Sequence, residues 1–197
     1  MNSKLISKVV LLLAVLSAGL TIILFQGCQK IPETPASSDK YRLVWNDDPT
    51  STMTVAWDQH EQANAMVAYG KEDQGRAFWK YAATKSADRV LDKYEMTTHF
   101  AKLTDLEPDQ KYYFVIKDDK GVSERYWFRT APDKPKAFTF VAGGDTKSDD
   151  GPLEAGRASN RIVAKLRPLF VMFNGDFCSG DGTYPDRWHT WLTDWHI

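Results

Sequence analysis

The sequence has little net charge and almost no cysteine, and each shortage excludes a class of protein. Its 25 basic and 26 acidic residues give a formal net charge of −1 over 197 residues. Composition therefore offers no electrostatic reason to expect a nucleic acid or an anionic membrane surface as a partner. With only two cysteines, Cys28 and Cys178, the chain has no disulfide framework, and its folded parts must be stabilised by packed cores.

Residues 1–28 have the pattern of an export segment. Lysines precede an apolar run over 9–25, which ends shortly before Gly27 and Cys28. A small residue before a lone cysteine at this place resembles a bacterial lipoprotein cleavage site, so Cys28 is the expected lipidation site. The run of 17 residues is short for a helix that crosses the hydrocarbon core. We expect an envelope lipoprotein, in the periplasm or at the outer membrane, attached to the membrane by its lipid anchor; an uncleaved anchor and simple secretion are the alternatives.

Residues 29–40 separate this segment from the folded part of the chain. They contain Pro32, Pro35 and a Ser-Ser pair, and they have too little apolar content to form a core. Such a composition predicts a flexible tether. The first folded domain is therefore expected to begin at Tyr41.

The region 41–131 shows the pattern of an all-β domain. Short segments rich in β-branched and aromatic residues alternate with polar turns. In one segment Met53, Val55 and Trp57 share a face, which makes Trp57 a candidate core anchor. The predicted strands are 41–46, 53–57, 65–69, 78–84, 95–102, 111–117 and 125–130, with a hairpin turn over 118–121. Seven strands of this length predict a β-sandwich.

One local motif in this region is more specific. Leu106, Pro108 and Tyr112 have the Leu-x-Pro-x-x-x-Tyr spacing that resembles the tyrosine corner of fibronectin type III domains, where a buried Tyr hydroxyl bonds to upstream backbone. His60 and His99 have no chemical partner nearby in the sequence, and they are interpreted as surface or strand-end histidines. The domain is expected to be structural.

The region 137–197 begins with a strand, a helix and a second strand. Each strand is an apolar run that ends in Gly-Asp, at Asp145 after 137–142 and at Asp176 after 169–174. The helix is expected over 156–166. This order predicts a βαβ unit with parallel strands, whose carboxyl ends lie at the same edge of the sheet. Asp145 and Asp176 should therefore face one crevice.

Two converging carboxylates indicate a metal site. Without a cation they would repel each other, whereas a metal ion keeps both ionised. A carboxylate that bridges two ions suits phosphoryl transfer, because paired metals hold the attacking and leaving oxygens. Each Gly-Asp taken singly is also typical of a helix cap or a turn.

The motifs and their order resemble a known family. A fibronectin-like domain is followed by Phe-x-Phe-x-x-x-Gly-Asp, ending at Asp145, and by Phe-Asn-Gly-Asp, ending at Asp176. This arrangement is similar to the purple acid phosphatase branch of the calcineurin-like metallophosphoesterases. The resemblance implies a fibronectin III-like sandwich over 41–131, followed in 137–197 by the first, incomplete βαβ part of a metallophosphoesterase α/β sandwich. It also implies two metal ions, with Asp145 bound to one and Asp176 bridging both, and a phosphate ester substrate.

Three positions near these aspartates depart from the family pattern or extend it. Ser179 stands where purple acid phosphatases have the iron-binding tyrosine, so the metals could equally be Fe, Zn or Mn. Tyr184 could bind a metal only if the intervening Gly-rich loop folds back. Lys147 is a candidate contact to substrate phosphate, and a solvated loop lysine is the alternative.

The chain does not contain the later histidine motifs of this family. His189 and His196 lie seven residues apart, beside Trp188, Trp191 and Trp195, and they are interpreted as a packing or surface stripe rather than as metal ligands. We therefore expect an N-terminal fragment, inactive alone, of a metal-dependent phosphoric ester hydrolase, an acid phosphatase-like phosphomonoesterase or phosphodiesterase. The alternative is a lipid-anchored β-sandwich binding or adhesion module with a degenerate phosphoesterase remnant.

Overall fold

The computed structural model describes residues 30–146, 154–178, 184 and 186–195. The predicted export segment with Cys28, and also Lys147, Ser179 and His196, lie outside the described residues. Among the helices of the described part, none is both long enough and apolar enough to cross a membrane.

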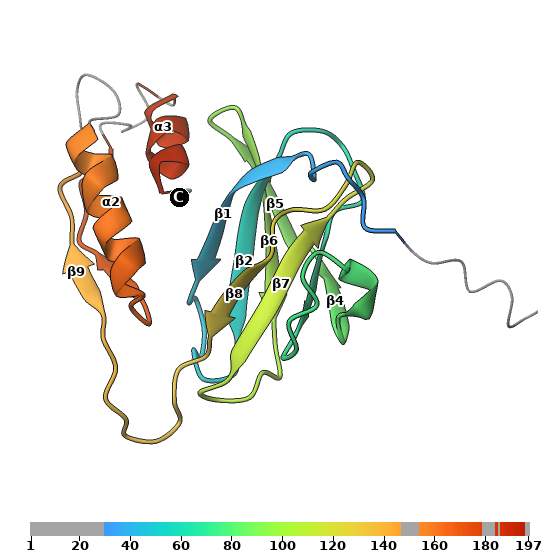
Figure 1. Cartoon of the computed structure of the whole chain (residues 1–197). Helices are drawn as coiled ribbons and strands as arrows, with labels where there is room; N and C mark the ends of the chain where they lie inside the picture. The colour runs from blue at the N-terminus through green and yellow to red at the C-terminus, as the bar shows by residue number, and fades with distance from the viewer. Residues whose placement is uncertain (1–29, 147–153, 179–183, 185, 196–197) are drawn as a thin grey trace, which may run out of the picture. The chain divides into compact units, whose positions relative to one another are not determined.

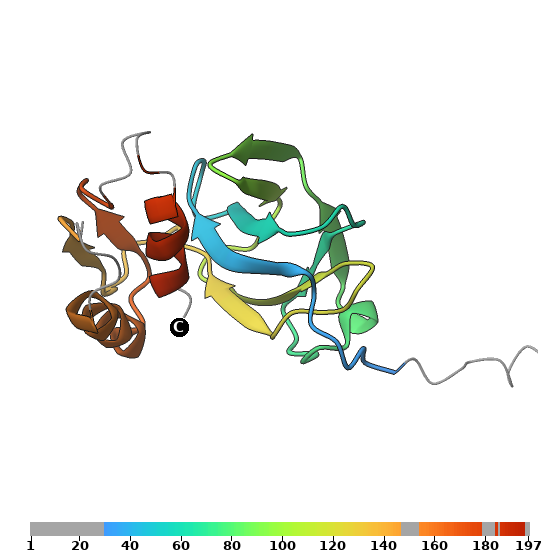
Figure 2. The same cartoon turned by 90° about the horizontal axis from the view of Figure 1, so that it is seen from above.

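The first folded region is a sandwich of two four-stranded sheets (Figures 1 and 2). One sheet has the order β1-β2-β6-β5 and the other β4-β3-β7-β8. The strands are β1 (Ser38–Val44), β2 (Met53–Gln59), β3 (Met66–Gly70), β4 (Ala83–Ser86), β5 (Arg89–Lys93), β6 (Met96–Leu103), β7 (Lys111–Lys117) and β8 (Tyr126–Arg129), and a short 3-10 helix, η1 (Phe78–Lys80), precedes β4. All named strand pairs of the sandwich are antiparallel.

The core lies between the two sheets and is formed mainly by β2, β6 and β7. β2 is a central strand paired with β1 and β6, and every one of its residues is buried. Trp57 is fully buried, and its indole N–H donates to the side-chain oxygen of Gln59 at 2.9 Å. The expectation that Trp57 anchors the core is confirmed, and its one polar atom is satisfied as burial requires.

The tyrosine corner has the expected geometry. The Tyr112 hydroxyl accepts a hydrogen bond from the backbone N–H of Glu107 at 2.9 Å. Tyr112 and Leu106 are both buried, and the Tyr112 ring stacks on Phe128 with 5.5 Å between centroids. This contact fixes the loop that leads into β7, and it confirms the sandwich type predicted from the motif.

The sequence prediction of seven strands is wrong, because the sandwich has eight. β5 was missed since all its residues are exposed, so it has no alternating apolar pattern. The turn that joins it to β6 consists of Tyr94 and Glu95, both with positive φ (56° and 60°), which lack the Asn-Gly signal typical of such turns. The predicted strand 78–84 is instead η1 followed by the start of β4.

The start of the domain also differs from the expected tether over 29–40. β1 begins at Ser38 rather than at Tyr41, and Ala36 and Lys40 are buried. The backbone of Thr34 accepts a hydrogen bond from Val122 at 3.3 Å. Residues 34–37 therefore lie against the hairpin between β7 and β8. This segment is too polar to pack through apolar contacts, and polar groups of the hairpin hold it by hydrogen bonds instead.

The second folded region contains β9 (Val141–Gly143), α2 (Glu154–Leu166), β10 (Val171–Phe173) and α3 (Asp186–Asp194). β9 and β10 pair in parallel, as the βαβ pattern predicts. α2 and α3 are joined by Arg157, which donates to the Asp194 carboxylate at 2.8 Å. The two strands are shorter than the apolar runs that predicted them, and Phe138, Phe140 and Met172 are about half exposed. Two strands alone do not bury both faces of a sheet.

Candidate metal centre

Asp145 and Asp176 follow the carboxyl ends of β9 and β10. Beyond the strands the parallel pairing continues: Asn174 N–H donates to the Gly143 carbonyl at 2.7 Å, and Asp145 N–H to the Gly175 carbonyl at 3.2 Å. The structure thus brings the backbones of the two aspartate loops side by side, as the βαβ interpretation requires. Their proposed roles as metal ligands remain a prediction.

The two loops have an unusual backbone conformation. Asp145 and Asp176 both adopt positive φ, 55° and 46°, a region that non-glycine residues enter rarely and at some cost. The loops also approach closely, since a Cβ atom added to Gly144 would lie 2.9 Å from the carbonyl oxygen of Asn174. Glycine at position 144 is therefore required by contact between the loops, which gives the first Gly-Asp a structural reason.

The donor chemistry of this pair fits a divalent or trivalent cation in part. Both aspartates are exposed, and carboxylate oxygens suit Mn, Fe and Zn. Within the described ranges, no further His, Cys, Asp or Glu groups with them closely enough to complete a set of three ligands. Two carboxylate residues are fewer ligands than a dinuclear site needs.

The remaining predicted residues have other environments. Tyr184 is 51% exposed, and the guanidinium of Arg187 lies 4.4 Å from its ring centroid. His189 is on α3. Trp191 and Trp195 of the same region make edge contacts with Phe173 at 5.3 and 5.9 Å. The two indole rings therefore pack against β10, while the interpretation of His189 and His196 as a packing or surface stripe stays a prediction.

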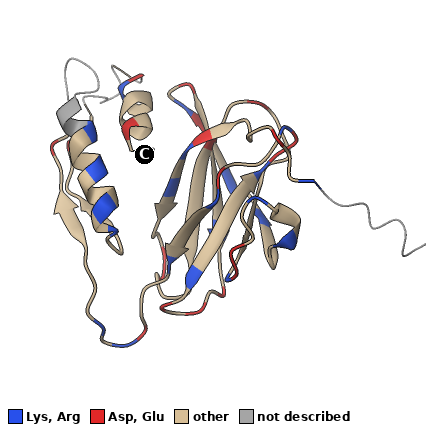
Figure 3. Cartoon of the chain, viewed as in Figure 1, with Lys and Arg blue, Asp and Glu red and all other residues tan. Residues whose placement is uncertain are grey.

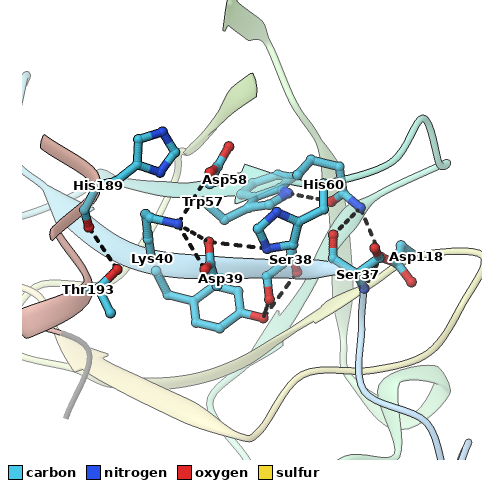
Figure 4. A network of polar contacts seen from close by, with 12 residues as sticks. Ser37, Ser38, Asp39, Lys40, Trp57, Asp58, His60, Asp118, His189 and Thr193 are labelled. Atoms are coloured by element: carbon cyan, nitrogen blue, oxygen red, sulfur yellow. Dashed lines mark hydrogen bonds and ion pairs between the residues drawn. The ribbon is translucent and has the colours of Figure 1, made fainter. Parts of the chain in front are cut away.

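The sandwich contains a cluster of ionisable side chains that sequence reasoning missed (Figure 4). Asp39, Asp58 and His60 place potential ligand atoms within 4.8 Å of one another. The Lys40 ammonium lies 2.9 Å from the Asp39 carboxylate and 3.5 Å from that of Asp58. The buried Lys40 ammonium pairs with both carboxylates, so the arrangement is an ion-pair cluster. The bulge in β1 between Asp39 and Arg42, which no local signal indicates, brings these groups together.

Replacing Lys40 by methionine is expected to lower the free energy of unfolding by about 3 kcal/mol, because the Asp58 carboxylate would lose its ammonium partner while remaining buried. Denaturant unfolding followed by Trp fluorescence measures the change. Lys71→Met is the matched control: Lys71 pairs with Glu107 at the surface, and its removal should cost less than about 1 kcal/mol. Equal losses in the two variants would show that the cluster contributes no buried ion pair.

Charge is distributed differently in the two regions (Figure 3). On the sandwich, acidic and basic residues are interspersed over the strands and loops. α2 instead carries Arg157, Arg161 and Lys165 at intervals of four residues, on one helical face. The near-zero net charge therefore includes a local basic stripe.

Fold and aspartate geometry together define a class: a β-sandwich domain joined to a parallel α/β unit with acidic residues at its strand ends. Residues 38–130 match the family model described as "Purple acid Phosphatase, N-terminal domain". The expected resemblance to the purple acid phosphatase branch is thereby confirmed, and the matched segment starts where β1 starts.

Sequence relatives agree with this match. An uncharacterized protein of Mycobacterium tuberculosis is 29% identical over 167 residues, covering 78% of this chain and 31% of that protein. The Fe(3+)-Zn(2+) purple acid phosphatase 12 of Arabidopsis thaliana is 24% identical over 213 residues, covering 95% of this chain and 44% of its own length. The chain thus spans less than half the length of these curated relatives.

Solved structures show the same fold. The purple acid phosphatase PPD1 from yellow lupin seeds superposes with a TM-score of 0.64 at 16% identity, over 82% of this chain and 33% of that one. A structure of PhoD gives a TM-score of 0.53 at 17% identity, over 74% of this chain and 29% of its own. At these identities the likeness concerns the fold alone, and it covers both the sandwich and residues beyond it.

Proposed function

We propose that this chain belongs to an exported, metal-dependent phosphoric ester hydrolase, an acid phosphatase-like phosphomonoesterase or phosphodiesterase. The observation that carries the proposal is the parallel pairing of β9 with β10, which continues into the two aspartate loops. The match of 38–130 to a purple acid phosphatase domain supports the same family. Because the chain spans 31% and 44% of two curated relatives, the activity is proposed for a protein with further metal ligands.

In the proposed site, Asp145 and Asp176 would supply carboxylate ligands to two metal ions. When bound, such ions would polarise a phosphoryl oxygen and lower the pKa of water, so that a nucleophile is available near neutral pH. The contribution of this chain would be to bring the two carboxylates together: the strands before them pair in parallel, and each aspartate has a left-handed backbone conformation. The metals are Fe, Zn or Mn, whose preferences these oxygen donors do not distinguish.

Attachment to a membrane is a separate part of the proposal. The sequence pattern over 1–28 supports export and lipidation at Cys28. A lipid anchor there would hold the hydrolase at the cell envelope, where phosphate esters in the surrounding medium are the substrates.

Metal removal tests the proposed activity. The full-length gene product should hydrolyse an aryl phosphate, lose that activity after dialysis against a chelator, and regain it with Mn²⁺ or Zn²⁺. Metal content measured by plasma emission should rise and fall with the rate. A full-length protein that retains full activity when metal-free, or that binds no divalent metal at all, would end the proposal.

A further inference from the structure

Three parts of the second folded region meet at one hydroxyl group, that of Thr146. The residue directly follows Asp145, and its backbone N–H donates to the Asp176 carbonyl at 3.0 Å. Its hydroxyl donates to the Phe177 carbonyl at 3.0 Å. The indole N–H of Trp191, on α3, donates to the same hydroxyl at 2.9 Å. One side chain therefore connects the loop after β9, the loop after β10 and α3.

The directions of these hydrogen bonds are determined by chemistry. A hydroxyl has one proton to donate, and an indole N–H can only donate. The Thr146 proton goes to Phe177, so the oxygen accepts from Trp191, and all three groups are satisfied. Trp191 is itself held by edge contacts with the rings of Phe173 and Phe177, at 5.3 and 5.2 Å. These ring contacts hold the indole independently of its hydrogen bond to Thr146.

The loops that this arrangement joins are those whose backbone needs support. Asp145 and Asp176 have φ of 55° and 46°, and such conformations persist only where the surroundings determine them. Thr146 adjoins the first aspartate, and its partner Phe177 adjoins the second. The bonds of Thr146 act directly on both strained positions.

We propose that Thr146 and Trp191 are positioning residues, which clasp the two aspartate loops and set the separation of their carboxylates. The positioning of metal ligands rests on the proposed function, whereas the connection between the two loops rests on the hydrogen bonds alone. Neither residue contacts the reacting atoms in this role. Groups that orient metal ligands typically change metal affinity by about 10- to 100-fold when removed.

The test compares the unaltered 197-residue chain with Thr146→Val, Trp191→Phe, the combination of these two and the matched control Thr146→Ser. Valine keeps the shape of threonine without the hydroxyl, phenylalanine keeps a ring without the N–H, and serine keeps the hydroxyl. One measurement is hydrogen exchange at the amides of Asp145 and Thr146, with β2 amides as the internal reference. The other is Mn²⁺ affinity by electron paramagnetic resonance, measured on the same variants of the full-length gene product, with Asp176→Asn to identify the site.

Thr146→Val and Trp191→Phe should raise exchange at these amides by about 10-fold or more and weaken Mn²⁺ binding by about 10- to 100-fold. Thr146→Ser should stay within about 2-fold of the unaltered chain. Adding Trp191→Phe to Thr146→Val should add little, because Thr146→Val already removes the bond between these two residues. Unchanged exchange in Thr146→Val, or equal effects of serine and valine, would overturn the clasp. An unaltered full-length protein that binds no Mn²⁺ would count against the proposed metal site, and the exchange results would still decide the clasp.

Discussion

Asp176→Asn is expected to lower phosphate ester hydrolysis by the full-length protein by about 10²- to 10³-fold, the scale of loss when a group that stabilises transition-state charge is removed. Asparagine keeps the size of the side chain and its carbonyl oxygen but removes the negative charge that holds a metal ion. If Asp176 contacts both ions, one substitution disturbs the whole dinuclear site. The loss should appear in kcat/KM and in the bound metal content together.

A neighbouring control separates this effect from general loss of charge. Asp133 is an exposed residue between the two folded regions, and Asp133→Asn should leave kcat/KM within about 2-fold, as surface substitutions away from special features usually do. Metal content near two ions per protein in Asp176→Asn, with activity intact, would contradict the assigned role of Asp176.

Asp118→Ala is expected to lower the free energy of unfolding of the sandwich by about 3–5 kcal/mol. The carboxylate is buried and accepts four hydrogen bonds: from the Ser37 N–H at 2.7 Å, the Gln59 side chain at 3.0 Å, and the N–H groups of Lys120 and Gly121 at 2.9 Å each. Alanine would leave these donors without an acceptor, and each buried orphan costs about 1–3 kcal/mol.

The position of the N-terminal segment depends on the same carboxylate (Figure 4). Ser37 is bound by Asp118, and a Cβ atom added to Gly121 would lie 2.1 Å from the Thr34 carbonyl, so the segment and the hairpin are in close contact. Asp118→Ala should therefore increase proteolysis around residues 34–37. Denaturant unfolding gives the stability change. Asp119→Ala is the control, since Asp119 is exposed and binds only Asn64 among the hydrogen bonds seen, and it should cost about 1 kcal/mol or less.

The same residue predicts an acid-dependent part of the stability. Burial is the largest influence on the Asp118 carboxyl and raises its pKa, but the hydrogen bonds from Gln59, Gly121, Lys120 and Ser37 together outweigh it, so the pKa is lowered. A carboxyl with a lowered folded-state pKa stabilises the fold above its unfolded value of about 3.9. That contribution is lost as pH falls below about 4, through the folded pKa. In Asp118→Asn, which cannot titrate, the dependence should be reduced; an unchanged pH profile would contradict the assignment.

Several features of the sandwich could be predicted because their signals are local. Tyr112 and Leu106 carry a motif whose geometry follows from spacing alone, and Trp57 belongs to a strand with regular alternation. β5 gave no such signal, since it lies at the sheet edge with all its residues exposed. Its pairing with β6 is a contact between strands, which periodicity does not encode.

Part of the candidate site could be predicted because its signals are also local. Gly-Asp after an apolar run marks a strand end, and the βαβ order then brings Asp145 and Asp176 together. Thr146 and Trp191 are 45 residues apart, and nothing in either local sequence indicates that they bind each other. The Lys40 cluster likewise depends on a bulge in β1 that the local sequence does not indicate.

The sequence by itself determined the order of parts, the sandwich type, the parallel strand pair and the two acidic strand ends, because each follows from local periodicity or from a short motif. Only the tertiary structure decided that residues 34–37 lie against the β7–β8 hairpin, that Lys40 is buried between two carboxylates, and that one threonine hydroxyl joins both aspartate loops to α3. These contacts join residues far apart in the chain. These contacts stabilise the fold by satisfying buried polar groups. The partners of such groups follow no periodic pattern along the sequence.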